Sequence, residues 1–190
     1  MKHQLARLIL LTVVAVVGIG IACKNTATGP NTDLSNLVTN GTFEANSQRT
    51  WNGWVLRDTP LDTLTLFAQD APPLGGSWSL KLQYNAPDIG YARWYLSNVS
   101  GFNSVYRITV WARANNDWPN GKVTLGKLSQ GNSTVLKSKL TPATVWTQYT
   151  VEDTFDLATE DSLYVELSAG GDHFPPGDMR FDLVRLEKIR

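Results

Sequence analysis

Short runs of alternating apolar and polar residues restrict the fold of this chain more than any other feature. In Tyr106–Ala114, the residues Tyr106, Ile108, Val110 and Ala112 occupy every second position. Side chains of a β-strand point alternately to opposite faces, so this run predicts a strand with one buried face and one solvated face. Similar alternation occurs in Ser79–Tyr84, Lys122–Leu128, Ser162–Ser168 and Met179–Ile189, where the last run allows either phase (Met179, Phe181 and Leu183 inward, or the opposite set).

Clusters of Gly, Pro, Asn and Asp separate the alternating runs. They occupy Ala71–Gly76, Asn115–Gly121 and Gly170–Gly177, and such residues are typical of turns. Helix signals are almost absent beyond Ser35. Short strands at this spacing predict an all-β fold, an antiparallel β-sandwich, in one domain without internal repeats.

The N-terminus carries the pattern of an exported protein. Lys2, His3 and Arg7 precede Leu8–Ala22, an uncharged run of 15 residues. A membrane-spanning helix needs about 20 apolar residues, so the run predicts a signal peptide over residues 1–22. Small residues before Cys23 resemble the lipobox of bacterial lipoproteins, in which the cysteine is lipidated, although Gly20 stands where an aliphatic residue is usual. An ordinary secretory signal is the alternative.

The composition of the remaining chain indicates an exported domain that is held together without a disulfide. Cys23 is the only cysteine, so no disulfide can form within one chain. Residues 23–34 are expected to be a lipidated cysteine and a flexible tether, and residues 35–190 the folded domain. We therefore expect a lipid anchor in a bacterial membrane, at the cell surface or the outer membrane. Without Lys2 and Arg7, 17 − 2 = 15 basic residues face 17 acidic ones, which gives no indication of a nucleic-acid partner.

Six short motifs follow one another along the domain: Asn36-Leu37 with Asn40-Gly41 and Phe43-Glu44; Gly53-Trp54; Gly76 with Ser79–Leu82; Tyr106 with Trp111-Ala112-Arg113; Trp146–Thr150; and Phe181-Asp182 with Val184 and Leu186. Their order resembles that of carbohydrate-binding modules of families 4, 9 and 22. The resemblance implies a β-jelly-roll sandwich. It implies function less strongly, because such sandwiches also serve as structural or adhesive modules.

The first of these motifs predicts local structure as well. Asn40-Gly41 is expected to form a turn in which glycine tolerates a positive φ, and Phe43 is expected to enter the core. We expect the larger aromatics Trp54, Trp78 and Trp146 in the core or at its rim. Trp118 lies in a polar turn, either as a loop-tip contact or as a lid on the sandwich edge.

The resemblance also implies a structural calcium ion. In the resembling modules, a glutamate equivalent to Glu44 commonly lies beside the aspartate of the last strand, here Asp182. Calcium prefers six to eight oxygen ligands, often including backbone carbonyls, and Thr42 and a residue of the Gly75–Trp78 loop are the candidate carbonyl donors. The ion would tie the first segment to the last. The alternative is that both acids are solvated or ion-paired.

Alternation also predicts which side chains leave the core. The outward set comprises Tyr91, Arg93 and Tyr95 on one run, Arg107, Trp111 and Arg113 on a second, and Tyr164 and Glu166 on a third. If these runs share one sheet, the eight side chains form a groove, and the resemblance implies that the concave face of that sheet binds glycan. The alternative for the first run is a one-residue slip, which turns Trp94 outward and Tyr95 inward.

The predicted groove suits a polysaccharide, because aromatic faces contact sugar rings while polar side chains bind hydroxyl groups. Three arginines favour an acidic polymer such as a uronic-acid polysaccharide. Glu166 argues against a purely anionic ligand. A neutral glucan or xylan is the alternative, and the two rank equally.

Catalytic signals are weak. His173 is the only histidine after the signal peptide, and no nucleophile elbow, zinc motif or marked carboxylate pair accompanies it. We therefore expect a non-catalytic surface lipoprotein that binds polysaccharide. The alternatives are a structural or adhesive module without a glycan cleft and, third, a small polysaccharide lyase or hydrolase.

Overall fold

The computed structural model describes residues 36–56, 65–84, 90–115, 121–170 and 177–190. The predicted signal peptide, Cys23 and the tether lie outside these residues, as do Ser35, Trp118 and His173. Among the described residues, no helix is long and apolar enough to cross a membrane.

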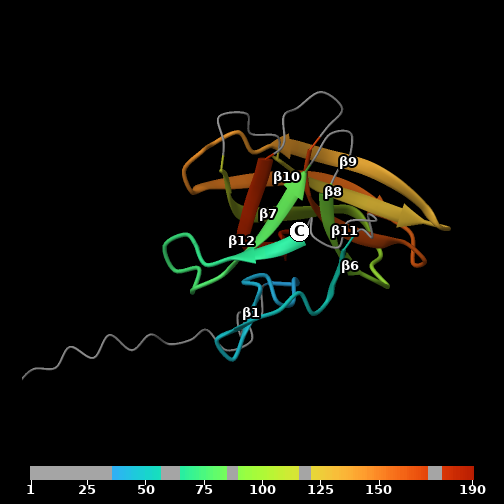
Figure 1. The fold of residues 1–190 in the computed structure, drawn as a ribbon. Coiled ribbons are helices and arrows are strands. Elements are labelled where there is room, and N and C mark those ends of the chain that lie inside the picture. The colour runs from blue at the N-terminus through green and yellow to red at the C-terminus, as the bar shows by residue number, and fades with distance from the viewer. Residues whose placement is uncertain (1–35, 57–64, 85–89, 116–120, 171–176) are drawn as a thin grey trace, which may run out of the picture.

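The described residues form β-strands in two packed layers (Figure 1). The strands are β1 (Glu44–Ala45), β2 (Gln48–Arg49), β3 (Trp54–Leu56), β4 (Thr65–Ala68), β5 (Ser79–Tyr84), β6 (Gly90–Leu96), β7 (Gly101–Ala114), β8 (Gly121–Ser129), β9 (Asn132–Leu140), β10 (Thr147–Leu157), β11 (Ser162–Ala169) and β12 (Gly177–Lys188). One sheet has the order β10-β7-β12-β5-β4 and the other β3-β6-β11-β8-β9, while β1 and β2 pair separately. The predicted antiparallel sandwich is confirmed.

The core lies between the two sheets and is built from the predicted alternating positions. On β7, Tyr106, Ile108, Val110 and Ala112 are buried, as predicted. On β6, Ala92 and Trp94 are buried too, so the one-residue slip that would turn Trp94 outward does not occur. Alternation predicted these faces correctly because each strand is buried on one side only.

The last strand changes phase in the middle, which the sequence left open. Met179 and Phe181 face the core, and the pairing with β7 then shifts between Asp182 and Arg185. Such a bulge adds residues to one strand only and reverses the side that later residues face. Val184 and Leu186 are therefore buried as well.

The N-terminal segment of the domain runs along this last strand. Leu37 N–H donates to the Leu186 carbonyl at 2.7 Å, and Leu186 N–H donates to Asn36 Oδ1 at 2.9 Å. Val184 N–H donates to the Gly41 carbonyl at 2.8 Å. The opening motif of the domain therefore ties the first described residues to the C-terminal strand.

The turn at Asn40-Gly41 forms, but the expected role of the glycine is wrong. Asn40 adopts the positive φ, at 56°. Gly41 is required for a different reason, since a Cβ at this position would overlap the carbonyl oxygen of Val184. Phe43 enters the core as predicted and packs against Trp54, with ring centroids 5.2 Å apart.

From β5 onward, strands alternate between the layers along the chain. β5, β7, β10 and β12 belong to one sheet, and β6, β8, β9 and β11 to the other. Only β8 and β9 form a hairpin of sequence neighbours within one sheet in this part of the chain. Outward side chains of consecutive strands therefore reach opposite faces of the sandwich.

Candidate functional site

The structure divides the eight predicted groove residues between two faces. β6 and β11 are hydrogen-bonded neighbours, whereas β7 belongs to the other sheet. The expectation that all these strands share one sheet is therefore wrong. Five of the eight lie together on the sheet that contains β6 and β11. We call them the tyrosine face: Tyr91, Arg93, Tyr95, Tyr164 and Glu166. The other three lie on the opposite outer surface: Arg107, Trp111 and Arg113. Alternation shows which side chains leave the core but not which outer surface they reach.

Strand register arranges the tyrosine face in rows across the sheet. One row joins Val55, Arg93, Glu166, Thr124 and Ser138 on β3, β6, β11, β8 and β9. The next row joins Tyr95, Tyr164, Gly126 and Val135. A polar row therefore lies beside a row that carries two aromatic rings.

Arg93 is at the centre of the tyrosine face. Its Nε lies 2.6 Å from Glu166 Oε2, and its guanidinium carbon lies 4.8 Å from the ring centroid of Tyr91 and 4.7 Å from that of Tyr164. Burial by itself would lower the pKa of Arg93, but hydrogen bonds to Glu166 and Tyr95 and the charge of Glu166 raise it. The guanidinium is thus permanently charged and fixed in orientation.

Tyr164 supports Arg93 on this face rather than contacting solvent. It points outward as predicted, but it is only 1% exposed. Its hydroxyl accepts a hydrogen bond from Ser133 Oγ at 3.0 Å, and a Cβ at Gly126 would overlap its ring. Tyr164 therefore lies flat over β8 and holds Arg93, whereas Tyr91 and Tyr95 are only partly buried.

Two residues of this face were not predicted. Thr124 lies beside Glu166 in the polar row and is fully buried, and its Oγ1 has no hydrogen-bond partner. Nothing in the sequence distinguishes it from other strand threonines. Gly126 did carry a signal, because a glycine inside a strand often marks a close approach of another group.

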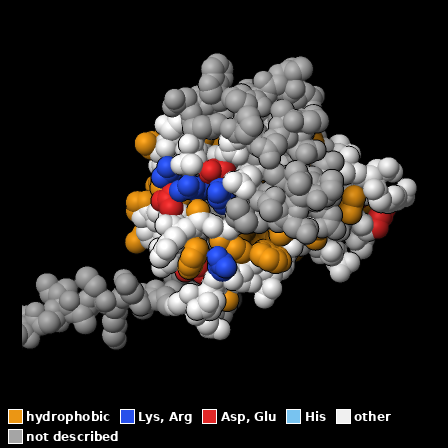
Figure 2. Space-filling model, in the orientation of Figure 1, with side chains coloured by type: hydrophobic (Ala, Val, Ile, Leu, Met, Phe, Trp, Pro, Cys, Tyr) orange, Lys and Arg blue, Asp and Glu red, His pale blue; other side chains and the backbone are white. Residues whose placement is uncertain are grey.

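The opposite outer surface is a network of ion pairs. Arg107 Nε lies 2.6 Å from Glu152 Oε2. Asp70 Oδ2 lies 3.0 Å from Arg113 and 2.5 Å from Arg180, and Asp70 Oδ1 accepts from Trp146 Nε1 at 3.2 Å. Figure 2 shows basic and acidic side chains of the described residues next to one another on the face in view.

The predicted calcium residues converge on one loop. Glu44 Oε1 accepts the N–H of Ser77 at 2.5 Å and also the N–H of Trp78. A Cβ at Gly76 would lie 2.6 Å from Glu44 Oε2, and a Cβ at Gly75 would overlap Asp182 Oδ2. Both carboxylates thus lie against the Gly75–Trp78 loop. Thr42 lies in the turn before Glu44, where its hydroxyl donates to the Glu44 carbonyl at 3.4 Å.

Asp182 has the properties of a cation ligand. Its side chain is fully buried, Oδ1 accepts from Leu183 N–H at 2.7 Å, and Oδ2 has no partner. Burial and the neighbouring charge of Glu44 raise the pKa of Asp182 to about 9. Two acids that lie against one loop fit the oxygen preference of calcium. The described residues contain no group of three or more His, Cys, Asp or Glu side chains that could hold a metal ion. Further ligands to calcium would therefore have to be carbonyls, hydroxyls or water.

Solved structures with the same fold include several sugar-binding proteins. A family 16 carbohydrate-binding module is 20% identical, with a TM-score of 0.52 over 80% of this chain and 99% of that one. The CBM22-1 xylan-binding domain of Paenibacillus barcinonensis Xyn10C is 12% identical, with a TM-score of 0.52 over 76% of this chain and 90% of that one. This chain has the sandwich fold of carbohydrate-binding modules. The resemblance that the sequence motifs indicated is confirmed for the fold.

One similar structure is an enzyme. The enzymatically active domain of bacteriophage CBA120 tailspike protein 4 is 17% identical, with a TM-score of 0.59 over 82% of this chain. The match spans only 22% of that protein, about a fifth of its length. No family model and no curated protein matches the chain. At these identities the comparisons show a shared fold, and function must be argued from the residues of this chain.

Proposed function

We propose that this protein binds a polysaccharide without cleaving it, and that the tyrosine face is the binding surface. The observation that carries the proposal is the Arg93–Glu166 pair, fixed between Tyr91 and Tyr164. A fixed guanidinium and carboxylate donate to and accept from neighbouring sugar hydroxyls, and adjacent rings cover the C–H faces of the sugar. The fold, which carbohydrate-binding modules share, supports the same proposal.

The roles within the face follow from accessibility. Tyr91 and Tyr95 are partly exposed and would contact the sugar rings. Tyr164 is buried and would act through Arg93. Thr124 is fully buried as well, so it would support Glu166, its neighbour in the polar row, rather than contact the sugar.

A neutral glycan suits this face better than an acidic one. Each of the three arginines that suggested an acidic ligand already pairs with a carboxylate: Arg93 with Glu166, Arg107 with Glu152 and Arg113 with Asp70. An acidic polymer would have to displace one of these acids. We therefore propose a neutral ligand such as a glucan, xylan or galactan.

The test is affinity electrophoresis of the full chain in gels that contain neutral glucan, xylan, galactan or a uronic-acid polymer. The running buffer needs a detergent without a sugar head group, because an alkyl glycoside would compete for the site. Retardation in a neutral polymer is expected. Tyr91→Ala and Tyr95→Ala should each weaken the affinity for the polymer about tenfold, which is the loss expected for a ring contact of about 1.4 kcal/mol.

The chain offers a matched control on its opposite surface. Arg107 pairs with Glu152 at the distance at which Arg93 pairs with Glu166, so Arg107→Ala should leave retardation unchanged while Arg93→Ala abolishes it. Retardation that only the uronic-acid polymer causes would overturn the neutral-ligand proposal. Retardation in none of the polymers would favour the structural or adhesive module instead.

Binding without cleavage requires its own assay. Glu166 is paired with Arg93, and Asp70 with two arginines, so neither of these two acids is free to act as a general acid. We expect no soluble reducing ends after long incubation of the protein with the bound polymer. Their release, if abolished by Glu166→Gln, would make the protein an enzyme.

We also propose that Glu44 and Asp182 hold a structural calcium ion. The unpartnered, buried Oδ2 of Asp182 beside the charge of Glu44 supports this, because a cation would stabilise both carboxylates in their ionised form. Carbonyl groups of Thr42 and of the Gly75–Trp78 loop remain the candidate additional ligands.

Export and lipid anchoring are proposed from the sequence alone. The uncharged run Leu8–Ala22 and the single Cys23 support a lipoprotein at a bacterial membrane, at the cell surface or the outer membrane. Metabolic labelling with a palmitate analogue should depend on Cys23 and disappear in Cys23→Ser. A wild-type chain that takes up no label would remove the anchor from this proposal.

A further inference from the structure

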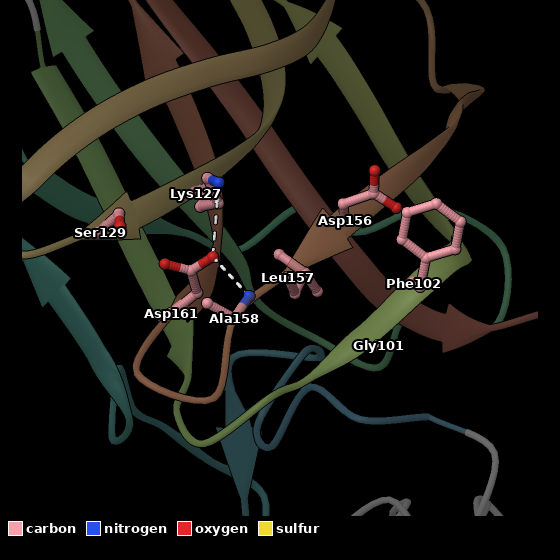
Figure 3. A pocket seen from close by; sticks show the side chains of 8 residues that line it. All are labelled: Gly101, Phe102, Lys127, Ser129, Asp156, Leu157, Ala158 and Asp161. Atoms are coloured by element: carbon pink, nitrogen blue, oxygen red, sulfur yellow. Dashed lines mark hydrogen bonds and ion pairs between the residues drawn. The ribbon is translucent and has the colours of Figure 1, made fainter.

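A pocket of about 410 Å³ opens at one end of the sandwich (Figure 3). It is lined by the start of β7, the end of β8, the end of β10 and the turn before β11, and its residues are Gly101, Phe102, Lys127, Ser129, Asp156, Leu157, Ala158 and Asp161. Lys127 pairs in register with the core residue Leu163. The pocket is therefore reached between the two sheets, and the tyrosine face lies on the outside of one of them.

Asp161 supplies a buried polar atom in this pocket. Its side chain is 2% exposed; Oδ2 accepts from Ala158 N–H at 2.9 Å and lies 3.4 Å from Lys127 Nζ. Oδ1 has no hydrogen-bond partner. The nearby Ser129 hydroxyl, the Ala158 N–H and the Lys127 ammonium hold the pKa of Asp161 below its ordinary value. A buried carboxylate oxygen without a donor is costly, and a ligand hydroxyl would satisfy it.

An exposed aromatic ring stands on the other side of the pocket. Phe102 is 79% exposed, and Figure 3 shows Phe102 and Asp156 across from Lys127 and Asp161, with Leu157 between them. Asp156 Oδ1 accepts from Asn103 N–H at 2.8 Å, which ties the start of β7, where the ring lies, to the end of β10. A single exposed aromatic is ordinary on a protein surface, but here it faces a buried carboxylate across a pocket.

We propose that this pocket is a second binding site, which takes one terminal pyranose ring of a neutral glycan. Phe102 would cover the C–H face of the ring, Asp161 Oδ1 would accept from one hydroxyl, and Lys127 would donate to its neighbour. The lining contains two acids and one lysine, so its net negative charge favours a neutral ligand over an anionic one. The choice of a glycan rests on the proposed function, whereas the site itself rests on Asp161 and Phe102.

The size of the pocket agrees with a single ring at a chain end. Its volume lies near the lower end of the range for small-molecule sites, about 300–1,000 Å³. The buried side chain of Leu157 lines it from the core side, so the ring would lie over Leu157 at the end of the sandwich. A protein with both sites would hold a polysaccharide along its length on the tyrosine face and at its end in this pocket.

The test is NMR titration of the isotopically labelled full chain, in a detergent without a sugar head group, with the methyl glycosides of glucose, galactose, xylose and mannose. At least one should cause saturable shifts in the amides of Gly101–Asn103 and Ala158–Asp161. Phe102→Ala and Asp161→Asn should each weaken this binding about tenfold. Val145→Ala, an exposed apolar side chain outside the pocket, should leave it unchanged.

The same titration separates this inference from the proposed function. A linear hexasaccharide of glucose or xylose should shift amides of β6 and β11 in wild type and in Phe102→Ala. Pocket shifts without shifts on β6 and β11 would sustain the second site and overturn the tyrosine face. No saturable pocket shift with any methyl glycoside, or shifts that survive both pocket variants, would overturn the second site.

Discussion

Arg93 and Glu166 lie directly opposite each other on β6 and β11, with Arg93 Nε 2.6 Å from Glu166 Oε2. Arg107 and Glu152 form the same pairing at the same distance on β7 and β10. The side chains of the first pair are 22% and 12% exposed, and those of the second pair 39% and 43%. The chain thus contains two ion pairs of equal geometry and unequal burial.

This difference predicts unequal costs of removing one partner. Arg93→Ala leaves Glu166 partly buried without its cation, and should lower the free energy of unfolding by roughly 2–3 kcal/mol. Arg107→Ala should cost less than about 1 kcal/mol, because solvent screens that pair. Urea unfolding of both variants measures the difference. Removing Glu166 as well should recover part of the loss in the Arg93→Ala background, and equal costs for the two single variants would contradict the structure.

Gly126 and Gly131 provide a second matched comparison. Gly126→Ala places a Cβ inside the Tyr164 ring, and overpacking of this kind costs roughly 1–3 kcal/mol. It should also weaken glycan binding, because Tyr164 supports Arg93. A Cβ at Gly131 meets nothing within 4 Å, but its φ is +82°, so Gly131→Ala should cost roughly 1 kcal/mol through backbone strain. Electrophoretic retardation by the polysaccharide should drop only for Gly126→Ala.

Calcium should stabilise wild type but not a variant that lacks one of the proposed carboxylate ligands. Chelator should lower the melting temperature of wild type, and added calcium should restore it. Asp182→Asn should not respond to calcium. In chelator it should melt no lower than wild type, because it removes an acid whose pKa burial and the charge of Glu44 raise to about 9, so that folding at neutral pH requires this acid to take up a proton. Glu160→Gln, at an exposed acid, serves as the control and should respond like wild type. A melting temperature that chelator leaves unchanged in wild type would discard the metal site.

Asp70 predicts a pH-dependent contribution to stability. Burial would raise its pKa, but hydrogen bonds from Trp146 and Arg180 and the charges of Arg113 and Arg180 lower it overall. A carboxyl whose folded pKa lies below the unfolded value, about 3.9, stabilises the fold above that value, and loses this effect as pH falls through the folded pKa. Asp70→Asn should therefore cost roughly 1–3 kcal/mol at pH 7. The difference in free energy of unfolding between wild type and Asp70→Asn should shrink below about pH 4. Urea unfolding of both proteins at neutral pH and below this value measures it. An equal difference under the two conditions would contradict this assignment.

Most of the strand faces could be predicted from single segments. Alternation placed Ile108 and Trp94 inside and Arg93 and Glu166 outside, because each strand is buried on one side. The bulge after Asp182 could not be predicted, since a register shift depends on how β12 pairs with β7. The role of Gly41 was likewise hidden, because its close contact is with Val184, far along the chain.

The sequence by itself determined the sandwich, the inward and outward sets, and the motif order shared with carbohydrate-binding modules, because these follow from local periodicity. Only the tertiary structure decided which outward sets meet. Trp111 and Arg93 are both outward, yet β7 and β6 belong to opposite layers, whereas Phe102 and Asp161, far apart in sequence, line one pocket. The physical reason is that strand periodicity fixes the side of a sheet that each residue faces, while long-range pairing fixes the sheet to which each strand belongs.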